Sequence, residues 1–501
     1  MKSGKYKKIT FYPIAFLLIG AVSLSLVCYN EPIIGDPYFG NTLYVGGSGS
    51  GNYSTIQSAI NAASSGDTIV YDGTYYENVD VNKQLIIHSA NGPANCVVNA
   101  SNTWDHVFDV TANYVKISGF TIEHAANGYR AAINLNSVTH ANISDNVIHD
   151  NIKGIIVSSS DNNFIIGNNI SNNGLGIDLD SSDYNQILQN DLYYNSGTGV
   201  DIDYCNYTII RYNDIIDSYT GMELYSSYNN QIEYNTINLH YTYGINLDYL
   251  CEYNTIKGNN LTHNTGTGIK LRYSCNNTIS INNATSNGVG IILDQSSHYN
   301  TIDDNDAFSN GGDGIYIHYS EHNIITKNTV ISNYANGIQV YSDNTTVTNN
   351  KAFNNQDDGI LLAYAKNNLL IGNNVSYNDN GFRLWQAKKN NLTNNNASDN
   401  TNNGFYIDFY SENNTVLNNT ASNGVYGINL EDTSTYNEVI GNTANSNSYY
   451  GIRLYSCSYN TIQGNIASQN DYDGINLWSS SNHNVICQNR FTYNSGRGIT
   501  L

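Results

Sequence analysis

A glycine followed by an apolar residue returns every 22 to 24 residues in sixteen copies, from Gly154-Ile155 to Gly498-Ile499. After each glycine the first and third residues are almost always apolar, as in Ile177/Leu179 and Val200/Ile202. The second and fourth are mostly polar or aromatic. This period of two predicts a short strand with one buried face. Such a strand buries little alone, so successive copies must stack in register to form a core.

A second short strand is predicted about ten residues after each glycine. Examples are Gln186-Ile187, Thr255-Ile256, Thr301-Ile302 and Thr461-Ile462. Asparagine recurs before and after it, as in Asn185 and Asn190. A polar residue at one place in every coil predicts stacked amides that hydrogen-bond to the coils above and below. The glycine predicts a backbone that turns sharply where no side chain fits.

A coil of about 23 residues with two or three short strands and tight turns predicts an all-β fold, a single-stranded right-handed parallel β-helix. Some twenty coils would make a rod ~90–100 Å long. Strands do not alternate with helical patterns of 10–15 residues, which argues against a βαβ fold.

One helix is predicted, from about Ser54 to Ser64, and it would cover the N-terminal end of the core. Its apolar stripe is formed by Ile56, Ala59, Ile60 and Ala63, with Ser54 as N-cap. The predicted divisions are an export signal or N-terminal anchor (1–28), a linker (29–41), a capping helix with irregular first coils (42–130) and regular repeats (131–501). The last coil ends in mid-strand at Leu501, and two outcomes stay open for this uncapped edge: association with another molecule, or fraying of the end.

The N-terminal residues indicate export. Four lysines (Lys2, Lys5, Lys7 and Lys8) precede an uncharged apolar run over 9–27. The run is close to the lower limit for spanning a bilayer, so a cleaved signal and a retained membrane anchor both stay open. The expected location is secreted or at the cell surface.

The charge composition limits which classes of binding partner are expected. Only 13% of residues are charged and the formal net charge is −21. Such acidity argues against nucleic acid and is compatible with cations or sugars. The seven cysteines include Cys251 and Cys275 on neighbouring coils, so that a disulfide between them stays open.

The segment from Thr55 to Ala63, followed by Gly66-Asp67-Thr68-Ile69 and Gly73-Thr74, resembles the opening of pectin-lyase-like β-helices. The Gly-Ile-x-Leu … Asn-x-Ile … Asn coils resemble the NosD-like carbohydrate-binding and sugar-hydrolase repeats, over residues 42–501. The resemblance implies the β-helix fold. For function it leaves lyases, hydrolases, epimerases and proteins without known activity open. The eleven histidines form no evident ligand pair, which argues against a copper site.

Two outward ladders are expected beside the buried residues of the main strand, with ~4.8 Å between coils. The first holds Asp178, Asp201, Glu223, Asn246, Lys270, Ile292, Tyr316, Gln339, Leu361, Arg383 and Tyr406. The second holds Asp180, Asp203, Tyr225, Asp248, Arg272, Asp294, His318, Tyr341, Ala363, Trp385, Asp408, Glu431, Tyr455 and Trp478. Sugar sites combine aromatic rings with carboxylates and amides in this way. The predicted glycan-binding residues are Asp248, Trp385, Asp408, Tyr455 and Trp478.

Two further sites are predicted on these ladders. Four aspartates lie on adjacent coils, namely Asp178, Asp180, Asp201 and Asp203. Because their charges would repel one another without a counter-ion, they predict a calcium site. Calcium is the one candidate cofactor, and no cofactor is expected to be required. A base beside a cation that neutralises a uronate is the arrangement a lyase or epimerase needs. The candidate catalytic residues are Arg272, Asp294 and His318, with Lys270 and Tyr316 beside them.

A polysaccharide or cell-surface glycan is therefore the expected partner, bound by a glycan-binding or structural, adhesive rod. The alternative is an enzyme acting on acidic polysaccharide as a uronate lyase or epimerase. A glycoside hydrolase would need paired acids, for which Asp357-Asp358 and Asp303-Asp304 are candidates in turns.

Overall fold

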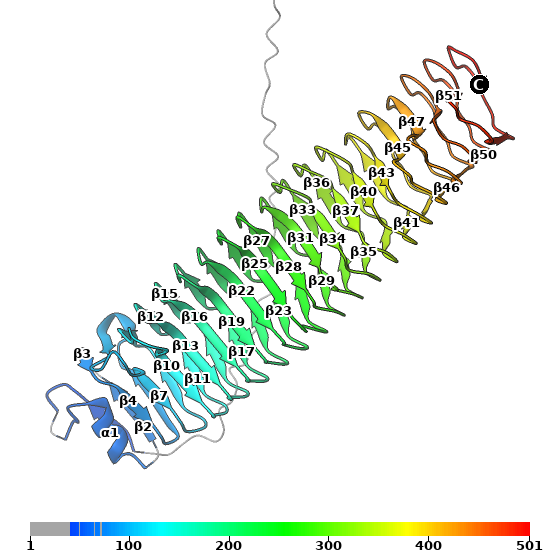
Figure 1. The fold of residues 1–501 in the computed structure, drawn as a ribbon. Helices are drawn as coiled ribbons and strands as arrows, with labels where there is room; N and C mark the ends of the chain where they lie inside the picture. The colour runs from blue at the N-terminus through cyan, green and yellow to red at the C-terminus, as the bar shows by residue number, and fades with distance from the viewer. Residues whose placement is uncertain (1–40, 50, 65, 71–72) are drawn as a thin grey trace, which may run out of the picture. The chain divides into compact units, whose positions relative to one another are not determined.

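The computed structural model describes residues 41–501 except 50, 65, 71 and 72, and these form one solenoid of stacked coils (Figure 1). Nearly all of the predicted export segment (1–28) and linker (29–41) lies outside the described residues. No helix of the described part is long and apolar enough to cross a membrane.

From β3 (Gly73–Tyr76) to β42 (Asn374–Ser376) each full coil carries three strands that stack in parallel on those of the next coil, and the later coils carry two strands and single bridges. In one three-stranded coil the strands are β16 (Leu175–Asp180), β17 (Gln186–Leu188) and β18 (Asp191–Tyr193). The next main strand, β19 (Thr198–Asp203), pairs with β16 so that Ile177 lies opposite Val200. Predicted buried positions thus stack in register, and the chain has about nineteen turns where about twenty were expected.

The longest strands form the main sheet, which has nineteen strands among the described residues. They are β4 (Val79–Val81), β7 (Phe108–Val110), β10 (Ala131–Asn136), β13 (Lys153–Ser158), β16, β19, β22 (Thr220–Tyr225), β25 (Tyr243–Asp248), β28 (Thr267–Arg272), β31 (Val289–Asp294), β34 (Ile315–His318), β37 (Ile338–Tyr341), β40 (Ile360–Ala363), β43 (Phe382–Trp385), β45 (Asn403–Asp408), β47 (Tyr426–Leu430), β49 (Ile452–Tyr455), β51 (Ile475–Trp478) and β53 (Ile499–Thr500).

Two sheets of shorter strands close each coil. The second sheet runs from β1 (Leu43–Val45) to β52 (Val485–Cys487), with twenty strands in the described part. The third runs from β3 (Gly73–Tyr76) to β42 (Asn374–Ser376), with fourteen. Beyond β42 it continues as single bridges, the first joining Asn374 to Asn396.

The core is a stack of aliphatic side chains, as the alternation predicts. Ile177, Leu179, Val200 and Ile202 are fully buried, and the same holds at the equivalent positions of later coils as far as Ile475. Two aromatic rings replace them on β43 and β45, where Phe382 and Phe405 stack with centroids 4.8 Å apart. Burial of one such apolar side chain stabilises the folded state by about 1.5–3 kcal/mol, and every stacked coil adds a similar contribution.

Seven of the sixteen repeat glycines, Gly314 among them, lie at bends just before the main strand and the other nine lie inside it, so the predicted turn is present in part of the coils. None of the sixteen has a positive φ among the described residues. Their role is close approach: a Cβ on Gly314 would lie 2.1 Å from Val330 Cγ1 and 2.8 Å from Gly337 O. Left-handed residues such as Tyr184 (φ 58) and Asn162 (φ 58) make the turns.

The predicted asparagine ladders are confirmed in buried turns. Asn168 donates from Nδ2 to Asn190 Oδ1 (3.0 Å) and to the carbonyl of Ile143 (2.9 Å). One ladder of amides between the second and third sheets is unbroken from Asn146 to Asn489. Each amide satisfies backbone groups that a tight turn would otherwise leave buried and unpaired.

Helix α1 (Ile56–Ala62) lies within the predicted range and packs against β1, β4 and β2 (Gly66–Val70). Its N-cap is Thr55 rather than Ser54, because Thr55 Oγ1 accepts from Ser58 N–H at 3.1 Å. At the other end of the solenoid Leu501 is exposed, and association there stays a prediction. Cys251 and Cys275 are free thiols, so the structure contains no disulfide between them.

Candidate functional site

The two predicted ladders lie on the outer face of the main sheet in the expected register. Asp178 is opposite Asp201, Arg272 opposite Asp294, and Trp385 opposite Asp408. Sequence analysis ended the first ladder at Tyr406, but it continues with Asn429, Arg453 and Asn476.

The acidic patch at the N-terminal end of the ladders is partly neutralised. Lys153 forms an ion pair with Asp178, so the predicted absence of a counter-charge is wrong for that residue. Burial, together with Asp203 and Asp178, raises the pKa of Asp201 to about 7. In the structure no three of the four aspartates bring their oxygens within 4.8 Å of one another. Calcium binding here stays a prediction.

The predicted catalytic constellation is divided into two pairs. Arg272 donates from Nε and from a terminal nitrogen to the two oxygens of Asp248, at 2.8 and 2.5 Å. This bidentate contact raises the pKa of Arg272 and uses Asp248, one of the predicted sugar ligands. Lys270 lies 3.3 Å from the Tyr243 hydroxyl and 4.9 Å from the centre of its ring. Neither cation is therefore free beside His318.

The second pair is His318 and Asp294. His318 Nδ1 lies 2.9 Å from Asp294 Oδ1, and the carboxylate orients the imidazole. The ring of Tyr316 is stacked 5.3 Å away, and burial with Asp313 and Asp294 nearby raises the pKa of its phenol to about 12. Tyr316 therefore stays protonated at neutral pH.

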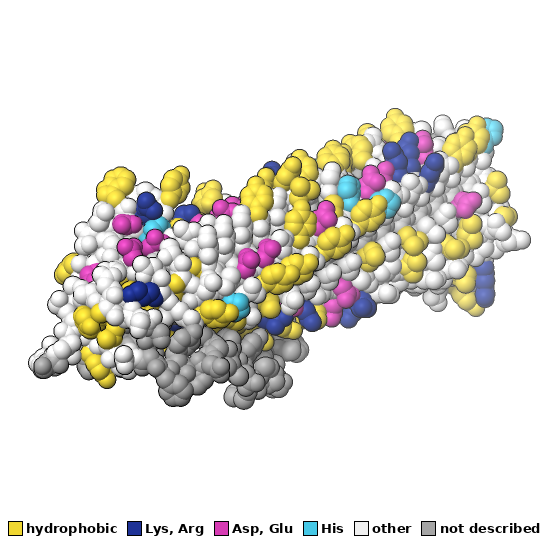
Figure 2. Space-filling view, turned by 90° about the horizontal axis from the view of Figure 1, so that it is seen from below, with side chains coloured by type: hydrophobic (Ala, Val, Ile, Leu, Met, Phe, Trp, Pro, Cys, Tyr) yellow, Lys and Arg dark blue, Asp and Glu magenta, His cyan; other side chains and the backbone are white. Residues whose placement is uncertain are grey.

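An aromatic ledge begins at His318 and crosses five consecutive coils. Its members are His318, Tyr341, Tyr364, Trp385 and Phe409. Successive ring centroids are 5.4, 5.1, 4.9 and 5.9 Å apart. Seen in space-filling form, hydrophobic side chains, tyrosine included, form rows along the solenoid (Figure 2). Offset and edge-to-face contacts of this kind hold each ring in place.

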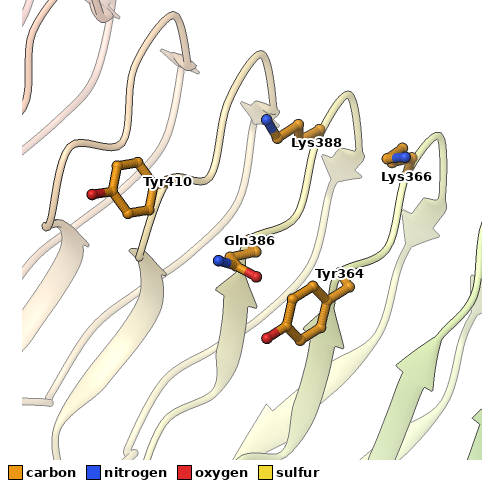
Figure 3. Close-up of a pocket in the computed structure, with 5 residues that line it drawn as sticks. All are labelled: Tyr364, Lys366, Gln386, Lys388 and Tyr410. Carbon is orange, nitrogen blue, oxygen red and sulfur yellow. The ribbon is translucent and has the colours of Figure 1, made fainter.

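Beside the ledge lies a hollow of about 560 Å³, lined by Tyr364, Lys366, Gln386, Lys388 and Tyr410. The lysines are cross-coil partners in the turn after the main strand, and Figure 3 shows the tyrosines and Gln386 nearer the strand ends. Lys388 Nζ pairs with Glu412 at 2.9 Å. Sequence analysis missed this group because it followed positions two and four of the strand, and these residues come after the strand.

A network of charged side chains begins at Arg383 on β43 and continues on the coils after it. Arg383 donates to Asp408 Oδ2 (2.9 Å) and lies 5.3 Å from the centre of the Tyr406 ring. The Tyr406 hydroxyl donates to Glu431 Oε2 at 2.8 Å, and Glu431 also pairs with Arg453. Each arginine thus has a carboxylate partner, and the network is close to neutral.

This network is largely buried. Asp408 is 3% exposed, and its Oδ1 has no hydrogen-bond partner in the described structure. Burial raises the pKa of Asp358 to about 6, although Asn380 donates to it at 2.8 Å. The predicted glycan ligand Asp408 is therefore covered by its neighbours on the outer face and paired with Arg383, which leaves it closed to a ligand. By contrast, Trp478 is 64% exposed and meets Tyr455 edge-on at 6.0 Å.

These features belong to a known class of fold. The family described as "Right handed beta helix region" matches residues 131–259, 248–375, 336–458 and 432–501. The chain therefore belongs to the right-handed β-helix family, as its repeats predict. The NosD-like grouping within that class stays a prediction.

Solved structures with a similar fold include the periplasmic alginate epimerase AlgG, at 17% identity over 68% of this chain and 77% of that chain (TM-score 0.41). The A-module of the Azotobacter vinelandii mannuronan C-5 epimerase AlgE4 is similar at 13% identity, over 89% and 92% (TM-score 0.32). An alginate lyase from Paenibacillus sp. str. FPU-7 is similar at 16%, over 49% and 92% (TM-score 0.32). No curated protein sequence matched. Likeness at this level shows the fold alone.

Proposed function

We propose that the protein binds a polysaccharide or cell-surface glycan along the aromatic ledge and the adjoining hollow. The observation that carries the proposal is the run of five contacting rings, from His318 to Phe409, beside a hollow lined by two lysines and a glutamine. Rings pack against the C–H faces of sugars, and the polar side chains bind hydroxyl or carboxylate groups.

The ledge suits an extended chain better than a single sugar. Its rings recur once per coil, with centroids 4.9 to 5.9 Å apart, so neighbouring units of one polymer can meet successive rings. Tyr364 and Tyr410 are 42% and 49% exposed, which leaves their faces accessible to a ligand. A secreted or cell-surface location, inferred from the N-terminal sequence, fits this partner.

A second candidate function is catalysis on an acidic polysaccharide. The observation in its favour is the His318–Asp294 pair at the start of the ledge, 2.9 Å apart. An oriented imidazole can remove the proton at C5 of a uronate, the step common to lyases and epimerases. Arg272 and Lys270 would have to leave Asp248 and Tyr243 to neutralise the uronate carboxylate.

Binding is tested on a glycan array, followed by calorimetry with the glycans retained. Trp385→Ala and Tyr364→Ala are each expected to weaken binding about tenfold or more, the effect of losing one stacking contact of 1–2 kcal/mol. Tyr204→Ala is the matched control, because Tyr204 also follows a main strand but lies seven coils from Tyr364. Absence of glycan binding, or equal loss in the control, would refute the proposal.

A further inference from the structure

Four side chains with metal-binding atoms meet on the third sheet near its N-terminal end, away from the ladders. Glu123 ends β9 (Thr121–Glu123) and His149 ends β12 (Val147–His149), and the two residues are cross-strand partners. His124 and Asp150 follow them, both with left-handed backbones (φ 72 and 58). A Glu-His pair on one coil thus lies beside a His-Asp pair on the next.

The donor atoms are close. His149 Nε2 lies 3.8 Å from Glu123 Oε2, and His149 Nδ1 lies 2.8 Å from Asp150 Oδ2. Within the described structure, Glu123, His149 and Asp150 form the one group of three or more such residues whose ligand atoms all lie within 4.8 Å of one another. Two atoms bound to one ion at 2.0–2.2 Å are separated by at most about 4.4 Å, and His149 can bind the ion through one ring nitrogen only, so the carboxylates have to rotate toward that nitrogen.

Neighbouring groups hold the donors in position. Asn99, one coil earlier, donates from Nδ2 to Glu123 Oε1 at 2.9 Å and lies 3.0 Å from His124 Nδ1. This contact fixes one oxygen of Glu123 and leaves the other facing His149. The Glu123 and His149 side chains are 18% and 27% exposed, so an ion from solvent can reach them while their rotamers are restricted.

We propose that Glu123, His149 and Asp150 bind a divalent transition ion of the zinc class, with His124 beside Glu123. An imidazole with two carboxylates suits Zn²⁺, whereas calcium and magnesium prefer oxygen donors throughout. Three protein ligands would leave one position for water or a substrate atom. The repeat pattern did not reveal this group of ligands, because Glu123 and His149 are 26 residues apart and the regular repeat is 22 to 24 residues.

The full-length protein is titrated with Zn²⁺ by calorimetry, with accessible thiols blocked because cysteines also bind zinc. We expect one site that is lost in His149→Ala and weakened at least tenfold in Glu123→Gln and in Asp150→Asn. Ca²⁺ is expected to give no heat at this site. Circular dichroism and thermal unfolding of each variant without metal establish that the fold is intact.

The matched control is His322→Ala. His322 Nε2 lies 3.8 Å from Glu321 Oε2, the same separation as in the proposed site, but that pair belongs to no group of three ligands. Zinc binding is expected to be unchanged in this variant. The proposal is overturned if the wild-type protein binds no zinc, if folded His149→Ala binds it as tightly, or if His322→Ala loses binding equally.

Discussion

Asn282 and Asn305 occupy the same turn of adjacent coils, and two N–H groups of Asn282 donate to the side-chain oxygen of Asn305. Asn305 Oδ1 accepts hydrogen bonds from the backbone N–H and the side-chain amide of Asn282, each at 2.9 Å. The amide of Asn305 in turn donates to the carbonyl of Ile279 (2.9 Å) and to Asn328 Oδ1 (3.0 Å). One buried side chain thereby connects three coils.

Asn305→Ala is expected to destabilise its region by about 3 kcal/mol, because it leaves more than one buried polar group without a partner, each costing about 1–3 kcal/mol. Repeat proteins need not unfold in one step, so the measurement is hydrogen exchange resolved by coil. Exchange should increase in the coils that contain Asn282 and Asn328. Asn391→Ala, at an exposed strand position, should leave exchange nearly unchanged, and an equal effect there would contradict the role of the ladder.

Gly314→Ala tests close approach between coils. The added Cβ would overlap Val330 Cγ1 at 2.1 Å and the Gly337 carbonyl at 2.8 Å, which requires the coils to separate. We expect a loss of about 3 kcal/mol, at the upper end for overpacked cores. Gly464→Ala is the control, since its Cβ would meet only Gly441 N at 3.9 Å and the cost is about 1–2 kcal/mol from its φ of 65°. A loss in Gly314→Ala no larger than that in Gly464→Ala would contradict the packing role of Gly314.

The fold was predictable because repetition multiplies a weak signal. Ile177 and Leu179 alone suggest a strand, and sixteen copies of that pattern leave few alternatives. The prediction of a turn at every repeat glycine held in only part of the coils, because a turn and a close contact both favour glycine. The sequence does not distinguish them, whereas the position of Gly337 O does.

The site was less predictable, because strand register shows which residues are neighbours but not which neighbour each side chain binds. The ladder placed Arg272 between Asp248 and Asp294, and the pattern did not indicate that it would bind Asp248 with both nitrogens. Turn residues such as Tyr364 and Lys366 were missed because the prediction followed only the second and fourth positions after each glycine.

The stability of the acidic patch is expected to depend on pH through Asp201. Its pKa is about 7 in the folded protein and ~3.9 in an unfolded chain, so between these values the folded state retains a proton that the unfolded state has lost. Stability therefore falls as pH rises through this window. Asp201→Asn should raise the unfolding temperature at pH 8.5 and change it little at pH 4. The exposed Asp180→Asn is the control, and a pH-independent effect of Asp201→Asn would contradict this assignment.

Calcium is expected to stabilise the same patch at pH 8.5, where Asp201, whose pKa is about 7, is ionised. At a free concentration of ten times Kd the gain would be about 1.4 kcal/mol, seen as a higher unfolding temperature. Magnesium at the same concentration is the control for ionic strength, and Asp178→Asn with Asp203→Asn should remove the effect. No shift in the unfolding temperature with calcium would refute the site.

Catalysis, if present, depends on His318 and Asp294. Formation of unsaturated uronates, followed by ultraviolet absorbance, or conversion between uronate epimers is measured on a panel of acidic polysaccharides. His318→Ala is expected to lower kcat by 10²–10⁴-fold, the usual contribution of a general base, and Asp294→Asn to lower it less. Arg272→Ala should chiefly raise KM, because a cation that neutralises the substrate carboxylate acts in binding. His322→Ala, an exposed histidine on a turn, should change neither constant. Unchanged activity in both His318→Ala and Arg272→Ala would exclude the lyase or epimerase function and leave glycan binding as the role of this face.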